Sequence, residues 1–212
     1  MSGVGVLPKV ALSPTSLVFP TQLIYTTSKT QTAKFTNSGL GLVEITKIAV
    51  TGQFTQTNNC GTTLSSGSSC TLTVTFKPTA IGNLTGSIAI TDNAPGSPQS
   101  LSLKGTATAL EITPTSLNFG NQPKGTASLP NTITLTNQSH ATVNFTSISI
   151  AGTDPGDFSL TDTCGASVAS GASCFIKVTF KPTATDARSA SVSVSDNGGG
   201  SPQKVSLAGT GT

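Results

Sequence analysis

The sequence predicts two consecutive all-β domains, each an antiparallel sandwich of about seven strands. Three observations lead to this prediction. The chain repeats itself, its apolar residues alternate with polar ones as in strands, and Gly, Pro, Asn and Asp separate the alternating runs. No segment sustains the 3.6-residue apolar spacing of a helix. A chain of 212 residues has room for two domains of about 100 residues each.

The repeat is visible in blocks of sequence that return in the same order. SPTSLVFPTQ begins at residue 13 and TPTSLNFGNQ at residue 113, and VTFKPTA occurs once in each half. An insertion, TDPG at 153–156, changes the offset between the halves from 100 to 104. About 40 of 96 aligned positions are identical, which indicates a duplication.

The repeats also place the domain boundaries. We expect residues 1–9 to be an N-terminal extension or inter-repeat linker, residues 10–108 to form repeat 1 and residues 109–212 to form repeat 2. The chain closes on SLAGTGT, at the point where repeat 1 closes on SLKGTAT and repeat 2 follows. This correspondence predicts that the chain is part of a longer array.

The individual strands follow from alternation. In repeat 1, Leu72, Val74 and Phe76 alternate with threonines, and the equivalent positions of repeat 2 keep the same parity. Around residues 43–50 and 143–150 the parity changes once, which predicts a bulge, or a bend where the strand changes sheets. About seven short, turn-linked strands per repeat are typical of an immunoglobulin-like sandwich.

The residues that recur also resemble a known family. SPTSLxF, TNSG, CTLTVTFKPT and the closing LSLKGT are similar to the ASH/Hydin-type repeat, whose bacterial members occur in surface proteins called choice-of-anchor D proteins. The resemblance covers nearly the whole chain. It implies a sandwich similar to that of major sperm protein, repeated in arrays that are mostly extracellular in bacteria. It brings no catalytic motif.

The four cysteines form two matching pairs. Cys60 and Cys70 enclose nine residues in CGTTLSSGSSC, and Cys164 and Cys174 enclose nine in CGASVASGASC. A hairpin folding about Ser65 would bring one pair to the Cα separation of a disulfide, about 4.4–6.8 Å. The spacing does not fit a zinc site or a C-x-x-C redox pair. We predict two intra-hairpin disulfides, with free buried thiols or a metal site as the weaker alternatives.

Such disulfides imply an oxidising compartment, which is the cell surface, the extracellular space or the periplasm. The N-terminal stretch MSGVGVLPKVAL lacks the basic start and long apolar run of a signal peptide. We therefore expect an extracellular or cell-surface protein whose signal peptide is not in this chain.

No constellation of residues predicts catalysis, a bound cofactor or a metal site. His140 is the single histidine, lies in a predicted loop and has Leu40 as its counterpart in repeat 1. A catalytic triad would need a serine and an acid to converge on it. Asp92 and Asp196 recur, but both begin an Asp-Asn sequence followed by Gly and Pro, which predicts a turn. We expect a protein that is not an enzyme.

Three acids cluster around the insertion of repeat 2: Asp154, Asp157 and Asp162. They lack the dense D-x-D-x-D-G order of a calcium loop, so calcium stays a weak alternative. Lysines and asparagines could also form the Lys–Asn cross-links of some surface domains. Alternation instead predicts that these lysines are exposed. The residues concerned are Lys34, Lys77, Lys181, Asn37 and Asn137.

Composition narrows the possible partners. Charged residues make up 9% of the chain, and the net charge of +3 comes from dispersed lysines and one arginine, Arg188, unlike a nucleic-acid-binding footprint. No apolar run reaches the ~20 residues of a membrane helix. With no Trp and one Tyr, the chain lacks the aromatic platforms that usually bind sugars. Most phenylalanines fall at core parity, including Phe19, Phe54 and Phe119.

The sequence therefore predicts a non-catalytic structural or interaction module, a disulfide-stapled rod of two domains from an extracellular bacterial surface or matrix protein. Its expected partners are neighbouring repeats, copies of itself, or a surface protein or glycan. One alternative is a self-assembling fibre subunit, in which Val4, Val6, Val10 and Leu12 add a strand to a neighbour, or a positive repeat 1 meets a slightly negative repeat 2. The other is a glycan- or peptide-binding accessory module.

Overall fold

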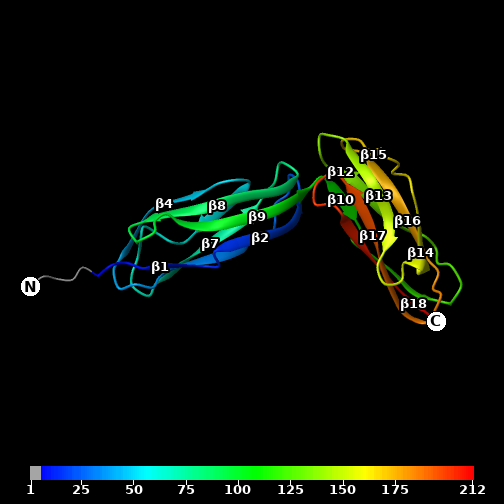
Figure 1. Cartoon of the computed structure of the whole chain (residues 1–212), viewed down its shortest axis with the longest axis horizontal. Coiled ribbons are helices and arrows are strands. Elements are labelled where there is room, and N and C mark those ends of the chain that lie inside the picture. Colours follow the sequence, from blue (N-terminus) through cyan, green and yellow to red (C-terminus); the bar gives the residue numbers. More distant parts are fainter. Residues whose placement is uncertain (1–5) are drawn as a thin grey trace, which may run out of the picture. The chain divides into compact units, whose positions relative to one another are not determined.

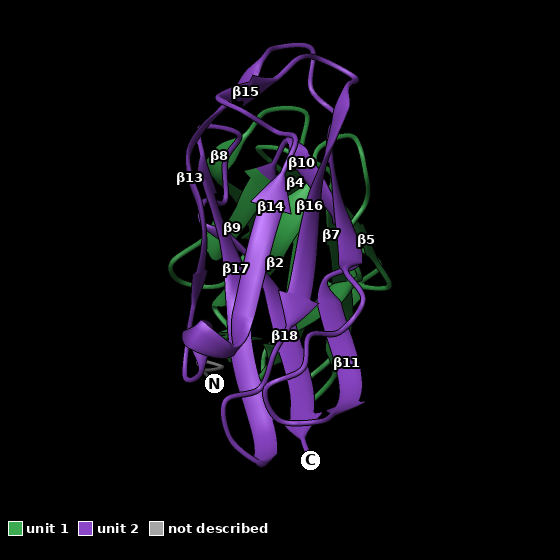
Figure 2. Cartoon of the chain, turned by 90° about the vertical axis from the view of Figure 1, so that its right-hand side faces the viewer, with its two compact units in different colours: residues 1–107 green, residues 108–212 purple. Residues whose placement is uncertain are grey.

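The computed structural model describes residues 6–212, which divide between two compact units, one ending at Ala107 and one beginning at Thr108 (Figures 1 and 2). We call them unit 1 and unit 2. The strands of unit 1 are β1 (Val10–Ser13), β2 (Ser16–Leu23), β3 (Gln31–Asn37), β4 (Val43–Val50), β5 (Phe54–Asn58), β6 (Thr63–Leu64), β7 (Ser69–Phe76), β8 (Gly82–Asp92) and β9 (Gln99–Thr108).

Unit 2 repeats this order of elements and adds a single 3₁₀ turn. Its elements are β10 (Leu110–Thr113), β11 (Ser116–Gln122), β12 (Asn131–Asn137), β13 (Val143–Ala151), η1 (Pro155–Asp157), β14 (Phe158–Asp162), β15 (Ser167–Val168), β16 (Ser173–Phe180), β17 (Asp186–Asp196) and β18 (Gln203–Gly211). The 3₁₀ turn lies in and just after the four-residue insertion of repeat 2.

Each unit is a sandwich of a four-stranded and a five-stranded sheet, which confirms the predicted fold class (Figure 2). In unit 1 the strand orders are β1-β3-β7-β5 and β2-β9-β8-β4-β6. In unit 2 they are β10-β12-β16-β14 and β11-β18-β17-β13-β15. The two units therefore have the same topology, strand for strand.

The structure has nine strands per unit where the sequence predicts about seven, and two local features account for the difference. The first strand is divided: β1 joins the four-stranded sheet and β2 the five-stranded sheet. Pro14 lies at this crossing, where its missing N–H cannot extend a ladder. The second extra strand is the two-residue β6, which pairs with the start of β4.

The sequence predicts purely antiparallel sheets, but the structure also contains parallel pairing. Strand β11 runs parallel to β18, so the five-stranded sheet of unit 2 is mixed. The connection explains this: β11 continues from β10 after the chain has crossed between sheets, and it enters the second sheet beside the last strand of the unit. The predicted bulge is confirmed, because the register of β4 with β8 shifts between Ile45 and Lys47. Strand β13 has the same shift against β17.

The core of each unit is filled by the inward-facing residues of the long strands. Leu72, Val74 and Phe76 have no exposed surface, as their alternation predicts. Around Phe76, three rings pack together, with centroids 4.9 Å from Phe54 and 6.0 Å from Phe19. The Phe76 ring lies on Gly105 of β9, where an added Cβ would come within 2.6 Å of the ring. Unit 2 repeats the trio with Phe119, Phe158 and Phe180, of which Phe119 is only half-buried.

Candidate functional site

The cysteines lie at the same place in both units. In unit 1, β5 pairs with β7 so that Asn58 faces Leu72, and two residues further on Cys60 faces Cys70. These two cysteines form a disulfide with a Cα–Cα separation of 4.7 Å, and both are buried. Cys164 and Cys174 form the equivalent disulfide of unit 2, with a Cα–Cα separation of 4.9 Å. No free cysteine is present, since these are the four cysteines of the chain.

The residues between the cysteines do not form the simple hairpin that the sequence analysis expects. After Cys60 the chain leaves the four-stranded sheet and places β6 against β4, on the five-stranded sheet. It then turns at Ser65–Ser68 and returns to Cys70 on β7. Leu64 of β6 is buried. Each disulfide therefore closes the neck of a loop that reaches from one sheet to the other, and we call residues 60–70 and 164–174 the cystine loops.

Asn37 holds this loop from inside, a role that the sequence analysis does not foresee. It has no exposed surface. Its Nδ2 donates to the carbonyl oxygens of Leu64 (3.0 Å) and Gly41 (2.8 Å), and its Oδ1 accepts from the N–H of Gly39 (3.0 Å). Asn137 does the same in unit 2, donating to Val168 O and Ala141 O. The sequence signal that could have indicated this role is the recurrence of Thr-Asn at the same position of both repeats, in FTNSG and LTNQS. The lysines Lys34, Lys77 and Lys181 are exposed, as predicted.

Asp92 and Asp196 form turns, as their sequence context predicts. The N–H of Ala94 donates to Asp92 Oδ1 at 2.7 Å, and the N–H of Gly198 donates to Asp196 Oδ1 at 2.6 Å. The other carboxylate oxygen of each is buried and has no hydrogen-bond partner among the residues described. Burial raises the pKa of Asp196 above its ordinary value, and the hydrogen bond from Gly198 offsets this only in part.

The acids near the insertion do not converge on one point. Arg188 Nη2 lies 2.7 Å from Asp154 Oδ1, and Arg188 Nε lies 2.5 Å from Asp157 Oδ2. Asp162 is elsewhere, at the end of β14, where its Oδ1 accepts from the N–H of Cys164. In residues 6–212 no group of three or more His, Cys, Asp or Glu is arranged to hold a metal ion. Two of the three carboxylates, those of Asp154 and Asp157, are thus paired with the single arginine.

Asp157 is the centre of this ionic cluster. It is 3% exposed, and its Oδ1 accepts both the N–H (3.0 Å) and the O–H (2.6 Å) of Thr183. Burial raises the pKa of Asp157, but the hydrogen bonds from Thr183 and Arg188 outweigh burial and hold the pKa below its ordinary value. His140 lies apart from this cluster, exposed in the loop after β12.

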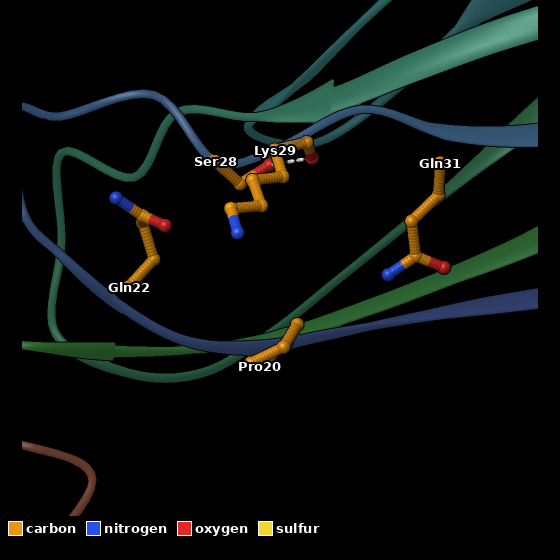
Figure 3. A pocket seen from close by; sticks show the side chains of 5 residues that line it. All are labelled: Pro20, Gln22, Ser28, Lys29 and Gln31. Carbon is orange, nitrogen blue, oxygen red and sulfur yellow. Dashed lines mark hydrogen bonds between the residues drawn. The ribbon is translucent and has the colours of Figure 1, made fainter.

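An open cleft of about 410 Å³ lies beside β2 of unit 1. It is lined by Pro20 and Gln22 of β2, by Ser28 and Lys29 of the following loop, and by Gln31 at the start of β3. Figure 3 shows the Lys29 side chain and the two glutamine amides projecting into one open space, with the Pro20 ring below them. The walls of the cleft are partly polar and partly apolar.

A cluster of exposed apolar residues marks the end of unit 1 where β1 begins. Val6, Leu7, Leu40 and Leu42 are 57%, 74%, 79% and 48% exposed. The chain before β1 lies against the loop after β3, because a Cβ on Gly41 would come within 2.3 Å of Val6 O. We call these four residues the apolar end. Unit 2 has His140 and Thr142 in place of Leu40 and Leu42.

Two family models match the chain, one over each unit. A sequence model of the ASH family, described as abnormal spindle-like microcephaly-associated, ASPM-SPD-2-Hydin, matches residues 6–100. A model of the HYDIN/CFA65/VesB-like Ig-like domain matches residues 108–210. The chain belongs to the ASH/Hydin family of Ig-like domains. Within this ASH/Hydin chain, each match covers most of one unit.

Several solved structures are similar to the ASH/Hydin chain, with low sequence identity and low TM-scores. A Porphyromonas gingivalis W83 protein of unknown function is 11% identical, with 95% of this chain and 99% of that chain covered and a TM-score of 0.42. The ASH/PapD-like domain 7 of human CEP192 is 17% identical (50% and 86% covered, TM-score 0.38). The Vibrio cholerae VesB protease is 14% identical (81% and 62% covered, TM-score 0.39).

A search of curated protein sequences gave no significant match. Within residues 6–212, no helix has the length and apolar character needed to cross a membrane.

Proposed function

We propose that this chain is a non-catalytic structural and interaction module, a disulfide-stapled pair of repeats from an extracellular bacterial surface or matrix protein. One observation carries the proposal: the same disulfide closes the same loop, at the same strand register, in both units. Disulfides persist in oxidising compartments and are rare in the cytosol. A duplication that keeps both cysteine pairs therefore favours a life outside the cytoplasm.

The rest of the chain supports a structural role. Its polar side chains are used to close turns, to hold the cystine loops and to neutralise one another, as Asn37, Asp92 and Asp157 show. The family to which it belongs consists of Ig-like domains, which typically serve as protein-interaction modules. We accordingly assign neighbouring repeats, or proteins of the same surface, as its partners.

Peptide mapping without reduction tests the compartment. The protein is secreted from its own host or isolated with thiols blocked at lysis, then digested and analysed by mass spectrometry. We expect two peptides that each carry an internal disulfide, Cys60–Cys70 in one and Cys164–Cys174 in the other, and that are each lighter by two hydrogen atoms than the reduced peptide. Recovery of all four cysteines with the blocking label would refute the extracellular assignment, because a protein of an oxidising compartment would not keep them reduced.

A second candidate function is self-association into a fibre, and the apolar end favours it. Four exposed apolar side chains in one place are typical of an interaction surface. Two of the residues that the sequence suggests for strand addition to a neighbouring molecule, Val10 and Leu12, already pair with β3 inside unit 1. Val4 lies outside the described residues. Association would therefore use Val6, Leu7, Leu40 and Leu42 rather than a donated β1.

Sedimentation velocity across a concentration series tests this second function. The variant Leu40→His with Leu42→Thr carries the residues of unit 2 at the apolar end, so it should fold normally. We expect the unmodified chain to associate with rising concentration and this variant to stay at its smallest species. A matched control, Leu129→Thr, changes an equally exposed leucine in unit 2. Identical sedimentation of all three proteins would rule out the apolar end as an assembly surface.

A further inference from the structure

The two units provide an internal control for the cleft beside β2. Two of its lining residues recur in unit 2, as Gln122 and Ser128, and both have the same structural bonds in each unit. Gln22 Nε2 donates to Thr26 Oγ1 as Gln122 Nε2 donates to Thr126 Oγ1. Ser28 Oγ accepts the N–H of Phe76 as Ser128 Oγ accepts that of Phe180. The shared residues therefore shape the loop.

The other lining residues differ between the units. Lys29 corresponds to Leu129, Gln31 to Asn131 and Pro20 to Gly120. The backbone of the loop is nevertheless the same, because Thr26 N–H donates to Leu23 O and Thr126 N–H donates to Pro123 O. Substitutions on an unchanged frame alter what the cleft presents to a ligand. The ammonium group at the cleft is thus a property of unit 1 alone.

Tyr25 adds an independent sign that unit 1 uses this loop. It occupies the third position of the Leu23–Thr26 turn with a φ of 64°, a left-handed conformation that disfavours a bulky side chain. The equivalent residue of unit 2 is Gly125, with a φ of 78°. Tyr25 is 46% exposed. Unit 1 therefore keeps a half-exposed aromatic at a strained position that glycine fills in its duplicate, and such strain is characteristic of functional sites.

The edge of β2 beside the cleft cannot accept a peptide strand in the usual way. Pro20 has no N–H to offer a partner strand. The carbonyl oxygen of Val18 already accepts a hydrogen bond from Gln31 Nε2 at 2.8 Å. Strand addition needs a row of available backbone donors and acceptors. A ligand of this cleft must therefore be recognised by side chains.

We propose that the cleft formed by Pro20, Gln22, Ser28, Lys29 and Gln31, together with Tyr25 on the same loop, binds an acidic oligosaccharide. The glutamine amide nitrogens are engaged with Thr26 and Val18, so the amides offer their oxygens to hydroxyl donors. Lys29 offers a cation to a carboxylate. The Pro20 ring lines the cleft and offers apolar surface to the C–H face of a sugar ring. Tyr25 is not a lining residue, but it lies on the same loop with its ring half-exposed, so it would extend this surface toward a bound sugar. Sugars that carry a uronate group combine these three features.

An NMR titration with tetragalacturonate tests the proposal on the full chain. We expect amide shifts confined to residues 18–31 and none in residues 118–131. The methyl-esterified tetrasaccharide has the same ring and no charge, so it should bind at least about tenfold more weakly. Raising the salt concentration should weaken the charged ligand only. Absence of shifts in residues 18–31 at about 10 mM ligand would overturn the proposal.

Variants that carry the unit 2 residues separate binding from folding. Lys29→Leu should weaken tetragalacturonate binding about tenfold, whereas Lys124→Leu, which removes the same charge from the equivalent loop of unit 2, should leave it unchanged. Tyr25→Gly should weaken binding and leave the melting temperature equal or higher, because it relieves the strained φ. A lower melting temperature with unchanged binding would show that Tyr25 serves packing and would remove it from the site. Equal effects of the two lysine variants would reduce the result to unspecific charge attraction and refute the site.

Discussion

The two units meet the same structural demand with different chemistry. At the start of β5 in unit 1, Gln53 Oε1 accepts the N–H groups of Thr79 and Ala80, at 2.6 and 3.3 Å. At the equivalent point of unit 2, Asp157 Oδ1 accepts the N–H and O–H of Thr183. The backbone carbonyl oxygen of each residue also accepts a hydrogen bond from the N–H of the lysine that follows the buried phenylalanine, Lys77 in unit 1 and Lys181 in unit 2.

The difference lies in charge. Asp157 is ionised in a buried position, so unit 2 adds Arg188 beside it and, through the insertion, Asp154. Unit 1 has Leu84 in place of Arg188 and needs no cation. The backbone N–H groups at this point need a hydrogen-bond acceptor in both units. A neutral amide serves in unit 1 and an ionised carboxylate in unit 2. An ionic choice makes unit 2 sensitive to pH and to substitution, and unit 1 is the control.

The largest effect is expected where the units are most alike. Replacing Cys60 and Cys70 by alanine should lower the stability of unit 1 by roughly 2–4 kcal/mol, because the unfolded chain regains the entropy of an open loop. The Cys164/Cys174 pair should have an equal effect on unit 2, since both loops span a sequence separation of 10. Hydrogen exchange in urea, resolved by unit, measures both. Clearly unequal losses would show that the cystine loops are not equivalent.

A smaller loss is expected for the asparagine that holds each cystine loop. Asn37→Ala leaves the buried carbonyl oxygens of Leu64 and Gly41 without their donor, which should cost about 1–3 kcal/mol. The exposed neighbour Ser38→Ala is the control and should change stability little. Urea unfolding measures both variants. If Asn37→Ala were as mild as its control, the buried hydrogen bonds would not be holding the loop.

Acid should distinguish the units at Asp157. Its folded pKa is lowered from 3.8, so its stabilising contribution is present above that pH and is lost as pH falls through the folded pKa. Between pH 5 and pH 2, unit 2 should therefore lose more stability than the Asp157→Asn variant of unit 2 does. At pH 7 this variant should melt several degrees lower, because Arg188 loses the buried one of its two ionised partners. Parallel pH profiles for the two proteins would contradict the ionic role of Asp157.

The smallest effect is expected at Asp196, with the opposite sign. Its folded pKa is raised from 3.8, so the half-buried carboxylate disfavours folding above the folded pKa, and the penalty disappears as pH falls below the unfolded value. Asp196→Asn keeps an acceptor for the Gly198 N–H and should raise the melting temperature at pH 7 by about a degree or two. The gain should vanish near pH 3. A lower melting temperature at pH 7 would show that the charge itself is needed.

The features that can be predicted from the sequence are those that depend on the pattern of neighbouring residues. Alternation places Leu72, Val74 and Phe76 in the core, and a change of parity locates the bulge in β4. The two-residue β6 is too short to carry a period, so the crossing of the cystine loop between sheets was not foreseen. Strand division at Pro14 is hidden for a similar reason, because one proline between two apolar runs is compatible with a single edge strand.

The candidate site was harder to foresee because it depends on residues far apart in the sequence and on backbone angles. Asp157 and Arg188 are separated by 31 positions and come from different elements. The sequence shows the acids around the insertion and the single arginine, but it does not show that Arg188 lies beside Asp154 and Asp157. Tyr25 is an ordinary residue in the sequence, and only its φ, compared with that of Gly125, marks it as unusual. The cleft exists because β2, the start of β3 and the loop between them approach one another.

The cystine loops have a mechanical consequence. If such a unit is pulled by its ends, the residues between its two cysteines cannot be drawn out, because the disulfide carries the load past them. With a sequence separation of 10, the chain of each loop could extend to about 35 Å, at about 3.5 Å per residue. The disulfide spans 4.7 or 4.9 Å between the Cα atoms, so each loop withholds about 30 Å of contour length from an extending chain. The exposed tip at Ser65–Ser68 can also be cut by a protease without parting the strands on either side. A unit built in this way keeps its two flanking strands joined through both stretching and nicking.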